Sequence, residues 1–171
     1  IWERARFYPM SLAPGAPQVT VRPFERCDVK DVLSLMRELA VYERYIDQFQ
    51  VAESDIIENG LSDSPRFGVF VAEMNGDIVG IAVHYEVPWT YDLKPVLVLK
   101  ELFVSKHARA LGAGRALLAQ IEKHALEIYA SRIAWTVLKD NEAAKQFYMK
   151  AGGQKDDVWE LWELKHSIKA E

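Results

Sequence analysis

The turn Arg109-Ala110-Leu111-Gly112-Ala113-Gly114 stands between an almost unbroken apolar run, residues 96–104, and a segment with helical periodicity. Its glycines let the main chain come close to a ligand where a strand gives way to a helix. The first N–H groups of a helix have no acceptor inside the helix and lie at the positive end of its dipole. Lys106, Arg109 and Arg115 add positive charge at the same place. The stretch therefore predicts a binding site for a phosphate or diphosphate group.

Other interpretations compete with a diphosphate site at this turn. The glycines would also serve a tight connection that binds no ligand. A Walker loop requires Gly-Lys followed by Ser or Thr, which is absent here. A dinucleotide-binding fold expects a third glycine where Leu117 stands, and it places the turn near the start of its domain. The two nucleotide-binding folds are therefore disfavoured, whereas the plain turn stays open.

Hydrophobic periodicity on both sides of the turn predicts alternating strands and helices. Asp28 and Asp31 indicate a capped helix start, and Asn75-Gly76-Asp77 is typical of a hairpin turn. The expected strands are 19–23, 67–73, 78–85, 96–104, 133–138 and 158–164, and the expected helices begin near Asp28, at 53–58, after the glycine turn and at 141–150. These elements predict an α/β (α+β) fold, with a mixed central sheet of about six to seven strands flanked by about four helices.

The composition bounds the class of protein. The chain has 171 residues, of which 50% are hydrophobic and 27% are charged, which suits a single domain over residues 17–171. Residues 1–16 show no sustained period, and we interpret them as a tail that is either vector-derived or part of an upstream extension. The formal charge of −4 argues against a nucleic-acid-binding surface.

Two further absences in the sequence exclude classes of site and partner. Cys27 is the only cysteine, and no group of cysteines and histidines has metal-ligand spacing. We therefore expect a reducing, cytoplasmic location and no metal. No apolar stretch approaches the length of about 20 residues that a membrane-spanning helix needs, so no membrane partner is expected.

The glycine turn matches the Arg/Gln-x-x-Gly-x-Gly/Ala signature of GNAT acetyltransferases, which the chain resembles over about residues 18–165. The resemblance implies the GNAT fold, with acetyl-CoA as co-substrate. It also implies that main-chain N–H groups of the turn bind the diphosphate of CoA, and that sheet-like main-chain bonds hold the thioester. The residues so implied are Arg109, Ala110, Leu111, Gly112, Ala113, Gly114 and Arg115 for the diphosphate, and Leu102, Phe103 and Val104 for the thioester.

A second stretch, residues 141–148, resembles the family's Asn-x-x-Ala-x-x-Phe-Tyr pattern. At about 100° per residue, Asn141 and Tyr148 fall on nearly the same face of a helix. Without a ligand, Asn141 would be only a helix cap and Tyr148 an aromatic residue at the edge of the core. The resemblance implies instead that Asn141 and Ala144 contact CoA, and that Tyr148 is the general acid that protonates the departing thiolate.

The attacking amine also needs a base. An alkylammonium has a pKa of about 10.4, so its deprotonation costs roughly 4.6 kcal/mol at pH 7. Glu101, near the end of the apolar strand, is the first candidate for the base, acting through water, and Glu43 is the second. An ion pair between Glu101 and Lys100 is the structural alternative.

Two stretches resemble the spermidine/spermine (diamine) N-acetyltransferase branch of the family. Residues 37–43 are similar to Lys-Glu-Leu-Ala-x-Tyr-Glu, which implies that Tyr42 and Glu43 lie at the amine site. Residues 99–104 are similar to Leu-Glu-Asp-x-Phe-Val, but Lys100 stands in place of the first acidic residue. That charge reversal argues against a long polyamine and leaves a shorter amine, an amino acid side chain or an aminoglycoside-like compound open.

The sequence thus predicts an N-acetyltransferase that moves the acetyl group of acetyl-CoA to a primary amine of a small molecule, by direct attack in a ternary complex. Trp89 would line the amine pocket through a cation–π contact, or else cover the edge of the core. The resemblance also implies a homodimer. We expect Trp135, Trp159 and Trp162 either to pack within the domain or to form a dimer contact. Two alternatives stay open: acetylation of a protein N-terminus or lysine, and a non-catalytic acetyl-CoA-binding sensor.

Overall fold

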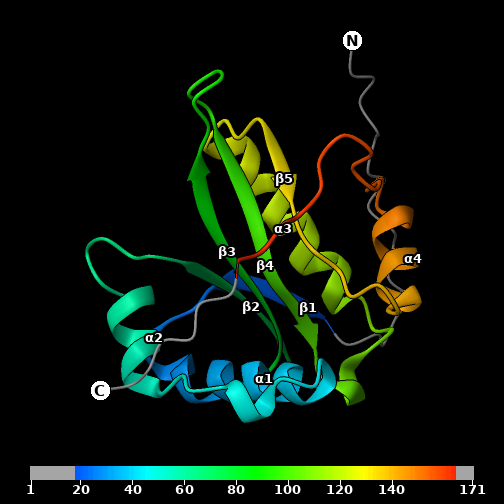
Figure 1. Ribbon diagram of the computed structural model, residues 1–171. Helices are drawn as coiled ribbons and strands as arrows, with labels where there is room; N and C mark the ends of the chain where they lie inside the picture. The colour runs from blue at the N-terminus through cyan, green and yellow to red at the C-terminus, as the bar shows by residue number, and fades with distance from the viewer. Residues whose placement is uncertain (1–17, 165–171) are drawn as a thin grey trace. The chain divides into compact units, whose positions relative to one another are not determined.

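The computed structural model of the protein describes residues 18–164 (Figure 1). The expected tail, residues 1–16, lies outside the described residues. The chain divides after Thr136 into two compact units, and each is described by itself.

The first unit is built on a mixed five-stranded sheet in the order β1-β2-β3-β4-β5. Its strands are β1 Val19–Pro23, β2 Gly68–Met74, β3 Asp77–Pro88, β4 Pro95–Val104 and β5 Arg132–Ala134. Each of the first four strands runs antiparallel to its neighbour, and β5 pairs parallel with β4. The expected hairpin forms between β2 and β3, where Asn75 and Gly76 have φ angles of 54° and 89°. Both values are left-handed, as a two-residue hairpin turn requires.

Helices cover both faces of this sheet. They are α1 Val29–Tyr42, α2 Glu53–Gly60 and α3 Ala113–Glu127, with short 3-10 turns η1 Arg26–Asp28, η2 Ile46–Gln48 and η3 Lys106–Ala108. A core of buried apolar side chains joins α1 and α2 to one face of the sheet, with Val83 and Phe103 among its members. On the other face α3 packs so closely that a Cβ at Gly80 would lie 3.2 Å from Leu117 Cδ1 and 3.0 Å from the Phe103 carbonyl oxygen. Gly80 therefore allows the helix and the neighbouring strand to approach together.

A bulge interrupts the pairing of β3 with β4. His84 pairs with Leu99 and Val83 pairs with Glu101, so Lys100 has no partner on β3. Neighbours along a strand point to opposite faces, whereas residues paired across strands share one. Leu99 therefore shares the face of His84, whose ring lies 4.8 Å from that of His124 on α3. Glu101 shares the opposite face with Val83, toward α1 and α2.

The second half of β4 has no strand along its β5 edge in the part of the chain that the structure describes. β5 pairs only with Val96, Leu97 and Val98, and it ends at Ala134, earlier than the strand expected over residues 133–138. The main chain of residues 99–104 is therefore bordered on one side only, by β3.

The final strand expected over residues 158–164 is wrong, because the structure gives no strand there. The Asp156 carboxylate accepts hydrogen bonds from the main-chain N–H groups of Val158 and Trp159, at 2.8 and 3.0 Å. Those N–H groups are the ones that a strand would donate to a neighbour. Within residues 18–164 the sheet therefore has five strands rather than about six to seven, although the expected mixed α/β architecture is confirmed.

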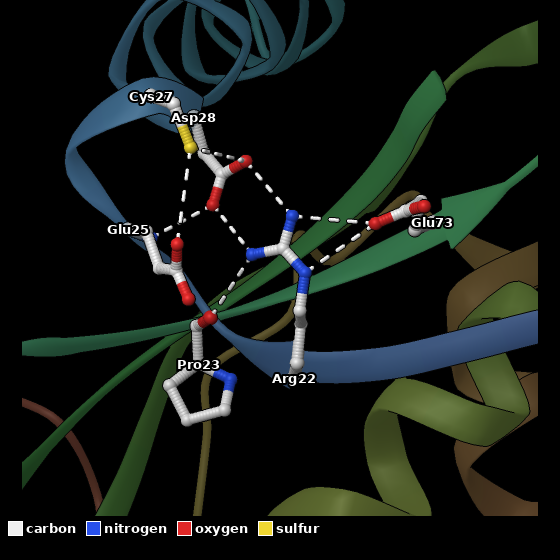
Figure 2. A network of polar contacts seen from close by, with 6 residues as sticks. All are labelled: Arg22, Pro23, Glu25, Cys27, Asp28 and Glu73. Atoms are coloured by element: carbon white, nitrogen blue, oxygen red, sulfur yellow. Dashed lines mark hydrogen bonds and ion pairs between the residues drawn. The ribbon is translucent and has the colours of Figure 1, made fainter. Parts of the chain in front are cut away.

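The expected cap at Asp28 is also corrected, because its carboxylate makes no capping bond to α1. Instead it accepts two hydrogen bonds from the Arg22 guanidinium, at 2.6 and 3.0 Å, and one from the Glu25 N–H at 2.7 Å (Figure 2). The same guanidinium donates to Glu73 on β2 at 3.3 Å. We call Arg22, Asp28 and Glu73 the Arg22 network; it ties β1, η1 and β2 together.

Candidate active site

The glycine turn has the conformation that its sequence predicts. Gly112 precedes α3 with φ 95°, and Ala110 has φ 62°. The first helical bond is donated by Ala116 to the Gly112 carbonyl, and no side chain caps the helix start. Among the described residues, the N–H groups that begin the helix therefore have no acceptor; they belong to Ala113, Gly114 and Arg115.

Space and charge at the turn suit an anionic ligand. A Cβ built at Gly112 would meet nothing within 4 Å, so the main chain there is open to a neighbouring molecule. Lys106 lies in η3 just before the turn, and Arg115 lies in the first turn of α3. Free N–H donors, an open approach and basic side chains together fit a diphosphate group.

Arg109 is held between residues that the sequence assigned to different roles. Its Nε donates to the Val104 carbonyl at 3.1 Å, and its Cζ lies 5.5 Å from the Tyr42 ring centre and 5.6 Å from that of Phe103. The structure thus brings the expected CoA-binding Arg109 together with the expected amine-site Tyr42. It also connects the turn to the end of β4, where Leu102, Phe103 and Val104 lie.

A cavity of about 370 Å³ lies on the α1 and α2 side of the sheet. Much of its wall is apolar, formed by Met36, Phe49, Ile56, Phe67 and Val83. Its charged lining residues are Asp55, Arg66, Lys100 and Glu101. Two of these, Lys100 and Glu101, are neighbours along β4, which the bulge allows.

Glu101 is the most unusual polar group in this cavity. Its Oε2 atom is buried and has no hydrogen-bond partner within residues 18–164. Burial raises the pKa of this carboxyl above its ordinary value, the Lys100 charge acts in the opposite direction, and the Glu43 charge raises it further. Buried polar groups normally have partners, so this carboxylate is a candidate for taking up a proton from a ligand.

Glu43 and Tyr45 approach Glu101 from the end of α1. The chain turns sharply there because Arg44 has φ 63° and the Tyr45 N–H bonds to the Ala40 carbonyl at 2.9 Å, as in a Schellman motif. Burial raises the pKa of Glu43, which Lys100 partly offsets. Burial, with the Glu101 and Glu43 charges, raises the pKa of Tyr45 to about 12.

Sequence reasoning missed Tyr45 and Arg66 as residues of this region. Tyr45 lies two residues after Glu43. A turn predicted at the end of α1 would have indicated that Tyr45 lies near Glu43. Arg66 lies between α2 and β2, and nothing in the local sequence distinguishes it from an ordinary loop arginine.

Trp89 and Tyr42 do not line the cavity. The Arg132 guanidinium carbon lies 4.9 Å from the Trp89 ring centre, so this aromatic ring has a cation from β5 beside it. Tyr42 instead lies beside Arg109. The cation–π contact expected at Trp89 is therefore made with a residue of the protein itself.

The second unit contains α4, Glu142–Lys150. Asn141 caps this helix as expected, since its side-chain oxygen accepts the Ala144 N–H at 3.1 Å. Tyr148 lies two turns later, with its ring 5.3 Å from that of Phe147. The helix ends at Lys150, and Gly152, with φ 91°, follows its C-cap Ala151.

Metal-binding clusters and membrane-spanning helices are both absent from the described residues. No group of three His, Cys, Asp or Glu side chains within residues 18–164 is placed to hold a metal ion. None of the helices in that range is long and apolar enough to cross a membrane.

Comparison with known proteins identifies the family. Residues 32–153 match the Acetyltransferase (GNAT) family. The chain is 28% identical over 153 residues to the human spermidine/spermine N(1)-acetyltransferase-like protein 1, covering 84% of this chain but only 22% of that protein. It is 26% identical over 161 residues to the pig thialysine N-epsilon-acetyltransferase, covering 90% of this chain and 92% of that one.

A solved structure agrees with this assignment at the level of the fold. The aminoglycoside N-acetyltransferase AAC(6')-Iy, in complex with CoA, superposes with a TM-score of 0.69 at 16% identity, covering 91% of this chain and 100% of that one. The expected fold class and the expected enzyme class are confirmed. The chain belongs to the GNAT acetyltransferase family, whose members use acetyl-CoA.

Proposed function

We propose that this acetyltransferase moves the acetyl group of acetyl-CoA directly to the primary amine of a small molecule, with Glu101 as the base and Tyr148 as the acid. The observation that carries the proposal is the buried, unpartnered Oε2 atom of Glu101 in the wall of the 370 Å³ cavity. An ammonium group entering that cavity supplies both the missing hydrogen-bond donor and the proton that must be removed.

The proton balance assigns one task to each group. The amine must lose a proton at a cost of roughly 4.6 kcal/mol at pH 7, and a raised carboxyl pKa narrows the gap between donor and acceptor. Glu101 takes this proton, directly or through water. As the new C–N bond forms and the C–S bond breaks, the Tyr148 hydroxyl gives its proton to the departing sulfur. The assignment of Tyr148 rests on its place in the Asn141 to Tyr148 pattern of the family.

The binding of acetyl-CoA is proposed at the glycine turn and the end of β4. The unpaired N–H groups of Ala113, Gly114 and Arg115 favour a diphosphate there, and Arg109 supplies charge beside them. The β4 edge without a strand neighbour favours sheet-like bonds to the acyl chain from residues 102–104. Asn141 and Ala144 are proposed as further CoA contacts, from the sequence pattern alone.

The size of the cavity favours a small acceptor over a protein segment. Ligand pockets range over about 300–1,000 Å³, so this cavity lies near the lower limit. The names of the relatives reported above, a spermidine/spermine N(1)-acetyltransferase-like protein and a thialysine N-epsilon-acetyltransferase, refer to small molecules that carry amines. Glu43, Lys100 and Glu101 are proposed to contact the acceptor, with Tyr42 at its edge, whereas the contact of Trp89 with Arg132 makes that ring a weaker candidate.

Thiol release from acetyl-CoA in the presence of a panel of small amines tests the proposal. We expect release with at least one amine, and a kcat about 10²-fold lower for Tyr148→Phe. Tyr129→Phe is the matched control, since Tyr129 is exposed at the end of α3. A protein that binds CoA tightly but releases thiol with no amine would contradict the proposal and favour the sensor.

We also propose that the protein is a homodimer. Large apolar side chains lie exposed along residues 158–164 of the second unit, namely Val158, Trp159, Leu161, Trp162 and Leu164. Light scattering measures the mass of the protein in solution. The double variant Trp159→Ser, Trp162→Ser should shift a dimer toward the monomer. A wild-type protein with the mass of a monomer would contradict the homodimer. A cytoplasmic location stays a prediction from the single cysteine, Cys27.

A further inference from the structure

The bulge in β4 places two opposite charges in one cavity. In a regular strand, Lys100 and Glu101 would point to opposite faces of the sheet. Here both line the cavity, because Lys100 is the residue skipped in the pairing with β3. The carboxylate that would accept the amine proton therefore has a cation as its immediate neighbour on the same wall.

The charged side chains of this cavity form no ion pair with one another within residues 18–164. The Asp55 Oδ2 atom accepts the Ala52 N–H at 2.8 Å at the start of α2, a bond that leaves its negative charge in place. Neither Lys100 nor Arg66 makes a hydrogen bond or an ion pair through its side chain within residues 18–164. Glu101 has no partner for Oε2. The cavity thus carries two carboxylates and two cations, of which Glu101, Lys100 and Arg66 have a polar group without a bonded partner among the described residues.

A ligand with ammonium groups at both ends does not fit this pattern. One ammonium would be attracted to Glu101, but the other would share the small cavity with Lys100 and Arg66. Like charges repel, and the repulsion is moderate here because Lys100 and Arg66 are both exposed to solvent. A ligand with an ammonium group and an anionic group would instead be attracted at both ends.

We propose that the acceptor is an aminocarboxylate, a small molecule whose amine lies toward Glu101 and whose carboxylate is bound by Lys100 and Arg66. Its methylene chain packs on the apolar wall of Met36, Phe49 and Phe67. Lys100 is then the residue that determines specificity, because it attracts this acceptor and repels a diamine of equal length. The proposal rests on the acetyltransferase function proposed above and narrows its substrate class.

Three amines of matched length test the proposal with the full chain. They are aminocaproate, hexylamine and hexamethylenediamine, which carry a carboxylate, a methyl group and a second ammonium at the far end. In thiol-release assays, we expect wild-type kcat/KM to favour aminocaproate over hexamethylenediamine by about tenfold or more. Lys100→Glu should reverse that order, and Arg66→Gln should reduce the ratio about threefold. Hexylamine has no charge at its far end and is the reference for the other two amines. Its kcat/KM relative to aminocaproate measures the attraction of the carboxylate, and its kcat/KM relative to hexamethylenediamine measures the repulsion of the second ammonium.

Lys30→Glu is the control, since it makes the same charge change on the exposed side of α1, away from the cavity. Its ratio should equal that of the wild type. A wild-type preference for the diamine, or an unchanged ratio in Lys100→Glu, overturns the proposal while leaving acetyl transfer intact. If no amine is acetylated, the proposed function fails, and calorimetry with aminocaproate decides the binding question. Binding that Lys100→Glu abolishes supports the aminocarboxylate site, whereas absent or unaffected binding overturns it.

Discussion

Two groups of charged side chains in the first unit show opposite behaviour. In the Arg22 network each charge has a bonded partner, and Asp28 meets Arg22 at 2.6 Å (Figure 2). In the group formed by Glu43, Lys100 and Glu101, no side-chain ion pair or hydrogen bond forms within residues 18–164. The Arg22 hydrogen bonds lower the pKa of Asp28, whereas burial raises that of Glu101. A satisfied network holds the fold together, and an unsatisfied group keeps its capacity to react.

The largest expected effect is on catalysis, at Glu101. Glu101→Gln keeps the shape but cannot accept the amine proton, so we expect kcat to fall about 10²-fold. The wild-type rate should fall as the pH drops through the raised pKa of Glu101, above the ordinary value of 4.5, and the variant should lack that dependence. The same variant should be more stable by about 1 kcal/mol at pH 7, since it removes a partly buried charge that has no bonded partner among the described residues.

Glu122→Gln is the matched control for that experiment. Glu122 is a partly buried carboxyl on α3 whose pKa is also raised by burial, but it does not line the cavity. Its kcat should equal that of the wild type. Full activity of Glu101→Gln would contradict the role of Glu101 as the base. The contrast between the Arg22 network and the group of Glu43, Lys100 and Glu101 would then have no bearing on catalysis.

The second effect is on stability, at Arg22. Arg22→Met keeps the aliphatic stem but leaves the nearly buried Asp28 carboxylate without its cation. Breaking a buried pair costs about 3–5 kcal/mol, and we expect about 2 kcal/mol here because water partly reaches Arg22, whose side chain is 31% exposed. Urea unfolding measures the loss, and kcat of the folded protein should not change. A free energy of unfolding equal to that of the wild type would mean that the Arg22 network does not stabilise the fold.

The third effect concerns the pH dependence of Asp28. Its folded pKa lies below the ordinary value of 3.8, chiefly because Arg22 donates hydrogen bonds to it. Its stabilising contribution is therefore present above pH 3.8 and is lost as the pH falls through the folded pKa. Asp28→Asn should cost about 1.5 kcal/mol at pH 7, and the cost should disappear in acid. A cost that does not vary with pH would assign the effect to packing and not to charge.

The smallest effect is expected at Glu73. This carboxylate is about as exposed as Arg22 and lies 3.3 Å from it. Exposed pairs contribute little, so Glu73→Gln should lose about 0.5 kcal/mol in urea unfolding. A loss as large as that of Arg22→Met would indicate that the network depends on β2 as much as on η1.

Short-range signals in the sequence were enough for much of the fold. Asn75-Gly76 adopts the left-handed turn, Asn141 caps α4, and Gly112 takes a positive φ before α3. Each of these features depends on a few consecutive residues, so the sequence carries it directly. The signature from which the family was predicted lies in the same kind of segment, and the family itself is confirmed.

Features that depend on distant partners could not be predicted. Asp28 has the sequence of a helix cap, but its carboxylate binds Arg22, which lies on β1. Residues 158–164 look like a strand, yet the structure pairs them with no other strand. The cavity position of Arg66 and the bulge at Lys100 likewise depend on pairing and packing across the sheet. Local propensity contains no information on such contacts.

The bulge also determines how β4 tolerates a change in its length. Deleting Lys100 would remove the bulge and make Leu99 and Glu101 neighbours, still opposite His84 and Val83. Because neighbours along a strand alternate, Glu101 would stay on the side of α1 and α2, and the residues after it would keep their faces. A deletion of one residue would thus remove the cation from the acceptor cavity and leave the carboxylate in place. Lys100 is therefore an insertion that adds a charge to the cavity without shifting the register of its neighbours.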